Sequence, residues 1–123
     1  MEEPRLGHVT TEITIGNPSQ TERKSTVEGL VDTGATFTVV PRQLARELQL
    51  PVIGQRRVRT ATGEVLLDRT RAFVQIDGQS EINPVLISDT LDRVLIGVIT
   101  LETLSLTVNP TTGELDEAES LLF

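Results

Sequence analysis

The alternation of apolar and polar residues along this chain predicts β-strands rather than disorder. It is cleanest over residues 8–15, where every second residue from Val9 to Ile15 falls on one face, and the turn-forming residues 16–19 end that strand. A polar stretch then leads into residues 25–31, which predict a second strand. We expect these two strands to pair as a hairpin.

A turn-forming loop and a helix follow the second strand. Residues 32–36 lie between apolar residues on both sides, with the run 37–40 after them, so this loop is expected to lie deep between strands. Pro41 suits the first residue of a helix because its missing N–H has no partner there. We expect that helix to run to about Leu48, since Pro51 prevents its extension.

A long hairpin is predicted in the middle of the chain. Residues 56–61 and 64–76 form its two strands, and Thr62 and Gly63 lie at the turn between them. Gly63 can supply the positive φ that a tight turn requires. The tip of this hairpin is expected to be mobile.

The rest of the chain predicts short elements. They are strands over residues 84–87 and 93–96, a helix over about 98–103 and a strand over 104–108. The apolar strand ending before Gly97 is similar to the one before Asp32, and each breaks at a glycine before a helix follows. The two halves of the chain therefore look like weakly related units.

Composition excludes several classes of function. The net charge is −7 and the chain has no Trp or Tyr, so a basic, base-stacking surface for nucleic acid is not expected. The chain has no Cys and a single His, His8, which excludes a disulfide framework, a thiolate zinc site and a histidine cluster. A metal site is not expected, because one cluster of acidic residues is interpreted as a solvated, charged stretch: Glu114, Asp116, Glu117 and Glu119.

Size and hydropathy predict one soluble domain. No apolar run approaches the length that spans a bilayer, and residues 1–6 carry charges without an apolar core. We therefore expect a cytoplasmic protein with no membrane partner. A single domain is expected over residues 1–123, with a core of about 8–115 and an acidic, then apolar, tail over 116–123.

The strongest candidate for chemistry is the tripeptide Asp-Thr-Gly at residues 32–34. Alone it is a weak signal, because Asp and Thr often cap a turn. Its setting strengthens it: an apolar strand precedes it, Ala35 and a second apolar strand follow it, and an apolar-apolar-Gly segment at 95–97 leads into a helix far downstream. In this order and spacing the chain resembles the retropepsin-like aspartic peptidases, in particular their small single-domain members from bacteria and archaea.

The resemblance covers residues 8–115 and implies both a fold and an activity. The fold would be mainly β, a closed retropepsin-like barrel with one or two short helices and a flap hairpin. The activity would be that of an aspartic endopeptidase, which cuts extended polypeptide and needs no cofactor.

The chemistry implied by the resemblance requires two copies of the chain. One ionised carboxylate takes a proton from the attacking water, and a second, protonated carboxyl donates to the scissile carbonyl oxygen. The chain has one such loop. A homodimer is therefore expected, in which a two-fold axis brings Asp32 and its copy together.

Three neighbours of Asp32 have expected roles. Gly34 allows the backbone to approach the carboxylate, although it would suit a simple turn as well. By the resemblance, Thr33 sends its hydroxyl across the dimer axis; a local bond to the backbone is the alternative. Ala35 offers no hydroxyl to the ionised carboxylate, so we expect activity to extend toward mildly acidic or near-neutral pH.

By the resemblance, Thr62 and Gly63 lie at the tip of a flap that closes over substrate and excludes water. A plain surface hairpin is the alternative. A flap can also pair its backbone with an extended peptide as an added strand, which leaves specificity to side-chain pockets. Aliphatic pocket walls are expected from residues that are also typical of a core: Val39, Val52, Ile53 and Ile87.

Two other interpretations stay open. The chain keeps an intact Asp-Thr-Gly loop, yet the same dimer and groove could serve as a catalytically weak or silent peptide-binding or assembly module. A third possibility is an unrelated small β-barrel with an accidental tripeptide. The apolar residues 121–123 fit either a strand of the dimer interface or a terminal tip.

Overall fold

In the computed structural model, which describes residues 9–118, strands and two short helices alternate along the chain. The elements in chain order are β1 (Thr10–Gly16), β2 (Lys24–Val31), β3 (Thr38–Pro41), α1 (Arg42–Glu47), β4 (Gly54–Thr60), β5 (Gly63–Ile76), β6 (Gln79–Ser88), β7 (Val94–Ile96), α2 (Val98–Thr103), β8 (Leu106–Val108) and β9 (Leu115–Glu117).

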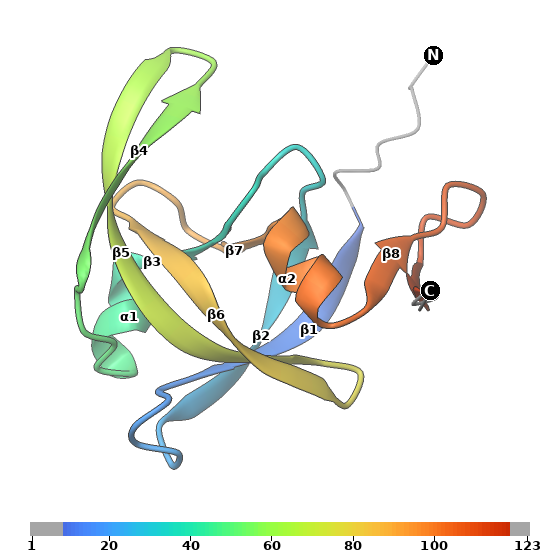
Figure 1. Ribbon diagram of the computed structural model, residues 1–123, viewed down its shortest axis with the longest axis horizontal. Coiled ribbons are helices and arrows are strands. Elements are labelled where there is room, and N and C mark those ends of the chain that lie inside the picture. Colours follow the sequence, from blue (N-terminus) through green and yellow to red (C-terminus); the bar gives the residue numbers. More distant parts are fainter. Residues whose placement is uncertain (1–8, 119–123) are drawn as a thin grey trace, which may run out of the picture.

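Most of these strands form one sheet that closes on itself. The strand order is β1-β2-β7-β3-β6-β5-β4, and β1 also pairs with β5, so every strand of this sheet except β4 belongs to a closed barrel (Figure 1). Strands β8 and β9 make a separate ribbon beside α2. The predicted mainly β barrel with two short helices is confirmed.

The barrel is filled by aliphatic side chains from alternate strand positions. In β1 the alternation predicted the buried face correctly, because Ile13 and Ile15 are fully buried. Helix α1 covers one end of the core with Leu44 and Ala45, and Leu48 directly after it is buried as well. The aliphatic core extends through the strands around the barrel and closes the interior to water.

The two similar strand endings of the sequence lie side by side in space. Strands β2 and β7 run parallel, and Val31 is paired with Ile96. The chain therefore leaves the barrel at the same level at Asp32 and at Gly97. This pairing brings together the two segments that the sequence analysis singled out.

The β4–β5 hairpin extends beyond the barrel as an arm (Figure 1). The turn is made by Ala61 and Thr62, one residue earlier than predicted, because Gly63 already pairs with Thr60 as the first residue of β5. Gly63 has a φ of 132°, the positive value that was predicted. Because β4 pairs only with β5, its outer edge carries no strand among residues 9–118. The arm thus presents a free strand edge.

Several predicted boundaries need correction. Pro41 is the last residue of β3 and the N-cap of α1 rather than the first helical residue, since it has extended backbone angles. The short strand predicted over 84–87 is part of the much longer β6, because β5 pairs with residues 79–87. The strand predicted from Leu104 begins later, since Leu104 is the C-cap of α2 and Ser105 has a positive φ.

Near the C-terminus, Asp116 and Glu117 belong to β9, so an ordered strand reaches into the segment predicted as a tail. The predictions for His8, Glu119 and residues 121–123 lie outside the described residues. Within residues 9–118 no helix has the length and apolar character needed to cross a membrane.

Candidate active site

The loop that carries Asp32 begins where β2 ends. The backbone N–H of Asp32 donates to the carbonyl oxygen of Ile96 at 2.9 Å, which extends the parallel β2–β7 pairing. The loop then turns back, because the N–H of Ala35 donates to the carbonyl oxygen of Asp32 at 3.0 Å. The backbone of Asp32 is therefore held at its N–H and at its carbonyl.

The segment after β7 binds the same loop. The N–H of Val98 donates to the carbonyl oxygen of Ala35 at 2.8 Å, and the N–H of Ile99 donates to that of Thr36 at 3.0 Å. The loop after Asp32 thus satisfies two of the free N–H groups in the first turn of α2. The two segments lock each other in place.

A buried pair of threonines also holds the Asp32 loop against the segment after β7. The hydroxyl oxygen of Thr38 accepts from the N–H of Gly97 at 3.0 Å and lies 2.6 Å from the hydroxyl oxygen of Thr100. A Cβ on Gly97 would lie 2.4 Å from the carbonyl carbon of Phe37, so only glycine fits. The sequence analysis missed Thr38 and Thr100. For Thr38 the available signal was a hydroxyl inside an otherwise apolar strand.

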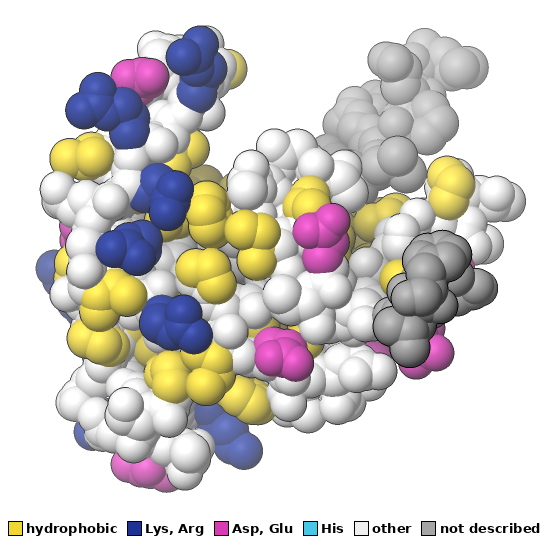
Figure 2. Space-filling model, viewed as in Figure 1, with side chains coloured by type: hydrophobic (Ala, Val, Ile, Leu, Met, Phe, Trp, Pro, Cys, Tyr) yellow, Lys and Arg dark blue, Asp and Glu magenta, His cyan; other side chains and the backbone are white. Residues whose placement is uncertain are grey.

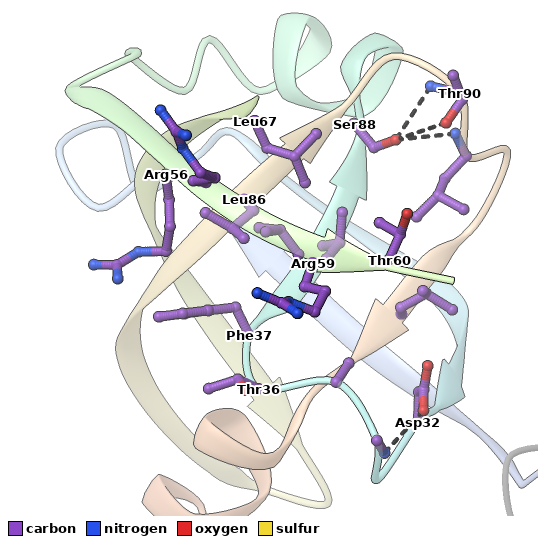
Figure 3. A pocket seen from close by; sticks show the side chains of 17 residues that line it. Asp32, Thr36, Phe37, Arg56, Arg59, Thr60, Leu67, Leu86, Ser88 and Thr90 are labelled. Atoms are coloured by element: carbon purple, nitrogen blue, oxygen red, sulfur yellow. Dashed lines mark hydrogen bonds between the residues drawn. The ribbon is translucent and has the colours of Figure 1, made fainter. Parts of the chain in front are cut away.

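The carboxylate of Asp32 is half-buried and lies at the wall of a groove (Figure 3). Its Oδ1 accepts a hydrogen bond from the N–H of Gly34 at 3.0 Å. A Cβ built on Gly34 would lie only 3.3 Å from that oxygen. Glycine therefore lets the backbone approach the carboxylate closely.

The groove has a volume of about 590 Å³ and lies between the Asp32 loop and the β4–β5 hairpin. The space-filling view shows the surface hollowed between the arm and the body of the barrel (Figure 2). Its polar lining includes Ser88 and Thr90, and its apolar lining consists of Ala35, Phe37, Val39, Val58, Leu67, Leu86, Leu91 and Leu95. Such a groove suits a chain-like ligand with apolar side chains.

Three of the predicted loop and tip residues do not line this groove. Asp32, Gly34 and Ala35 lie in its wall, whereas Thr33 is exposed outside it. Thr62 and Gly63 are exposed at the hairpin tip, away from the groove lining. The hairpin instead contributes strand β4 and Leu67 to the wall.

The expected aliphatic pocket walls are only partly right. Val39 lines the groove as predicted. Ile87 points into the barrel core, where it is fully buried, and Val52 and Ile53 are exposed before β4 and outside the groove lining. The prediction for these three residues is wrong. The side to which Ile87 points depends on how β6 pairs in the sheet, and the positions of Val52 and Ile53 depend on the path of the chain into the hairpin.

The sequence analysis also missed three arginines of β4. Arg56, Arg57 and Arg59 all belong to the groove lining. The guanidinium carbon of Arg56 lies 4.8 Å from the centroid of the Phe37 ring, a distance typical of a cation–π contact. The signal that could have found them was the charge pattern of the predicted flap strand.

An ion-pair network holds the root of the hairpin. The Arg42 guanidinium lies 2.7 Å from Asp89 and 2.8 Å from Asp68, and Gln55 on β4 donates to Asp68 at 3.1 Å. The hydrogen bonds from Gln55 and then Arg42 lower the pKa of Asp68. The hydrogen bond from Arg42 likewise lowers the pKa of Asp89. The network therefore links α1, the hairpin and the β6–β7 loop.

No group of three or more potential metal ligands occurs among residues 9–118. The chemistry that these residues can supply is carboxylate chemistry at Asp32, next to a groove of about 590 Å³. A single chain brings one such carboxylate to the groove wall.

Comparison with known proteins agrees with this geometry. No curated protein matches the chain. The family model described as aspartyl protease matches residues 11–117, which include the Asp32 loop, the hairpin and the segment around Gly97. This match covers most of the chain, and the protein therefore belongs to the aspartyl protease family.

Proposed function

We propose that this chain is one subunit of a homodimeric aspartic endopeptidase whose active site combines two Asp32 carboxylates, one from each subunit. The observation that carries the proposal is the position of Asp32 at the wall of the groove. The hydrogen bond from its N–H to Ile96, which extends the β2–β7 pairing, fixes this position. Membership of the aspartyl protease family supports the same reaction.

In this proposal the two carboxylates share one proton and activate a water molecule between them. The ionised carboxylate takes a proton from the water as its oxygen attacks the scissile carbonyl carbon, while the protonated carboxyl donates its proton to the carbonyl oxygen. The Gly34 N–H, which donates to Oδ1, holds the Asp32 side chain in a fixed orientation.

Dimerisation follows from the single Asp32 of each chain. A two-fold axis beside the loop gives an isologous contact in which each subunit supplies half of the dyad. Thr33 is exposed, and its hydroxyl makes no hydrogen bond within residues 9–118. In the proposed dimer this hydroxyl bonds the loop of the partner and so aligns the two carboxylates.

The proposed substrate is polypeptide in an extended conformation. Strand β4 borders the groove and has a free edge among the described residues, so a peptide can pair with it as an added strand. The tip residues Thr62 and Gly63 would then close over the bound peptide and exclude water. Apolar residues of the groove, such as Leu86 and Leu95, would contact its side chains.

The proposal is tested with an unfolded protein as substrate from about pH 4 to about pH 8, with the purified chain and its Asp32→Asn variant. We expect cleavage by the wild type and none by the variant. Asp77→Asn is the matched control, since Asp77 is exposed at the β5–β6 turn and should leave cleavage unchanged. Sedimentation in the same buffers reports the oligomeric state.

Other outcomes would change the conclusion. A stable dimer without cleavage at any pH would favour a peptide-binding or assembly module. A monomer at all concentrations would exclude a shared active site. Activity confined to strongly acidic solution would contradict the expectation from Ala35, which offers the ionised carboxylate no hydroxyl.

A further inference from the structure

The charge of the groove is opposite to the charge of the protein. The chain as a whole carries a net charge of −7. The groove lining, however, contains three arginines, Arg56, Arg57 and Arg59, and a single acidic residue, Asp32. Basic side chains also gather along the β4–β5 side of the molecule in the space-filling view (Figure 2). A substrate that enters the groove therefore meets a locally positive wall.

Arg56 is the arginine best placed to contact a bound peptide. Its guanidinium stacks over Phe37, which belongs to the loop that follows Asp32 (Figure 3). Its cross-strand neighbour Leu67 also lines the groove, so Arg56 and Leu67 border the groove from the same face of the hairpin. Within residues 9–118 no acidic side chain forms an ion pair with Arg56.

Arg57 and Arg59 add positive charge that is poorly neutralised. Both approach the carboxylate of Glu64, at 3.6 and 3.7 Å, and their side chains are 72% and 85% exposed. One glutamate thus faces two arginines at distances longer than a good charge-assisted hydrogen bond. The hairpin keeps a net positive charge next to Arg56.

We propose that Arg56 is a specificity-determining residue that selects an Asp or Glu side chain of the substrate close to the scissile bond. This inference rests on the proposed peptidase function. A carboxylate matches the planar fork of a guanidinium with two parallel hydrogen bonds. Stacking on Phe37 holds the fork in place before the substrate arrives, which lowers the entropy lost on binding. In the dimer each subunit supplies one such arginine, on either side of the dyad.

The competing explanation is that these arginines are only a solvated surface. The two explanations predict different preferences between a peptide with Glu and the same peptide with Gln. A solvated arginine treats a peptide with Glu and its Gln counterpart alike, apart from weak long-range attraction. An arginine that contacts the substrate carboxylate favours the Glu peptide, and only while its own guanidinium is present.

The test uses two short peptide libraries that are identical except that every Glu of one is Gln in the other. Binding is measured by fluorescence anisotropy on the Asp32→Asn protein, and cleavage by mass spectrometry on the protein with Asp32 intact. We expect the Glu library to bind about tenfold more tightly and to be cut preferentially beside its Glu residues. Raised ionic strength should reduce the preference.

Variants then assign the preference to a residue. Arg56→Gln should abolish the difference between the libraries while cleavage of the Gln library persists, and Arg56→Lys should restore part of it. Arg71→Gln is the matched control, because Arg71 is exposed on β5 and lies outside the groove lining. It removes the same charge and should leave the preference intact.

The outcomes separate this inference from the proposed function. Cleavage of both libraries at equal rates would overturn the inference alone. Equal loss of binding to both libraries in Arg56→Gln would also overturn it, since the arginine would then support the hairpin rather than select a carboxylate. A preference for Glu in binding without any cleavage would support carboxylate recognition by Arg56 but overturn the peptidase, and with it the role of Arg56 in choosing a scissile bond.

Discussion

The position of the Asp32 carboxylate depends on a residue that is far away in sequence and has no side chain. Gly97 lies where the chain leaves β7, and the backbone of Phe37 crosses directly over it. The contact is backbone against backbone, so no rotamer change can make room for a larger residue. Since Phe37 follows the Asp32 loop, we expect a change at Gly97 to displace that loop.

We therefore expect Gly97→Ala to destabilise the protein by about 1–3 kcal/mol and to reduce cleavage strongly. The added Cβ would lie 2.4 Å from the Phe37 carbonyl carbon, so one of the two loops must shift. Urea unfolding and cleavage of an unfolded protein measure the two effects.

Gly54→Ala is the matched control for this experiment. Its Cβ would meet only the end of the Arg69 side chain, at 2.6 Å, which can swing away. We expect a small change in the free energy of unfolding at Gly54. Equal destabilisation by both substitutions would contradict the special role of Gly97.

The residues of the site show where sequence reasoning succeeds and where it does not. The loop at 32–34 was identified because its signal is local: an apolar strand, a turn and a second apolar strand. Thr38 was missed because its partners, Gly97 and Thr100, are brought to it only by the closure of the barrel. From the sequence alone, a threonine hydroxyl cannot be assigned to a buried hydrogen bond until its partner is known.

At the scale of the elements, the β4–β5 hairpin is attached to the body of the protein at its root. Arg42 on α1 makes that attachment through Asp68, and Gln55 on β4 binds the same carboxylate. The side chains of Arg42 and Asp68 are only 23% and 20% exposed, so water screens this pair less than a surface pair.

This attachment predicts a pH-dependent stability. The pKa of Asp68 is lower in the folded protein than in the unfolded chain, because Gln55 and Arg42 bind the ionised form. The stabilisation is therefore fully present above the unfolded value of about 3.9 and is lost as the pH falls through the folded pKa. Asp68→Asn should lower the free energy of unfolding at neutral pH, and its difference from the wild type should shrink in acid.

Urea unfolding at about pH 7 and at about pH 3 measures this difference. Asp77→Asn is the control, since Asp77 is exposed and pairs with no basic side chain in the described part of the chain. If Asp68→Asn lowered the free energy of unfolding equally at both pH values, the carboxylate charge would not stabilise the root of the hairpin. Hydrogen exchange in β4 should rise in the variant if the attachment holds the hairpin.

Some of the elements were predicted correctly from the sequence and others were not, for physical reasons. The hairpin turn at Gly63 and the helix over Val98–Thr103 were found because their signals are local. The first half of β6 was missed, since its residues from Gln79 to Ile82 are polar or exposed and become a strand only by pairing with β5. The start of the first helix was placed one residue too early, at Pro41, because proline is accepted both in the extended backbone before a helix and in the first helical turn.

At the scale of the whole molecule, charge separates the groove from the rest of the surface. Acidic residues outnumber basic ones in the chain, while the groove wall is basic along β4. An acidic body repels acidic polypeptide in general, so attraction is confined to the one place where cleavage is proposed to occur.

The proposed shared active site would make activity a property of the dimer, which subunit mixing can test. If each active site takes one Asp32 from each subunit, a wild-type chain paired with an Asp32→Asn chain is inactive. Adding an equal amount of the variant to a fixed amount of wild type should therefore lower total cleavage to about half after subunits exchange at random. Asp77→Asn, which keeps its own active site, should raise total cleavage instead.

The time course of mixing adds a second check, because the loss of activity must follow the rate at which subunits exchange. Native mass spectrometry of an isotope-labelled wild type gives that rate independently. Substrate is kept in large excess, so that the variant cannot act merely by binding it. If Asp32→Asn left the wild-type rate unchanged after exchange was complete, each chain would hold a complete active site, and the two-carboxylate dimer would have to be abandoned.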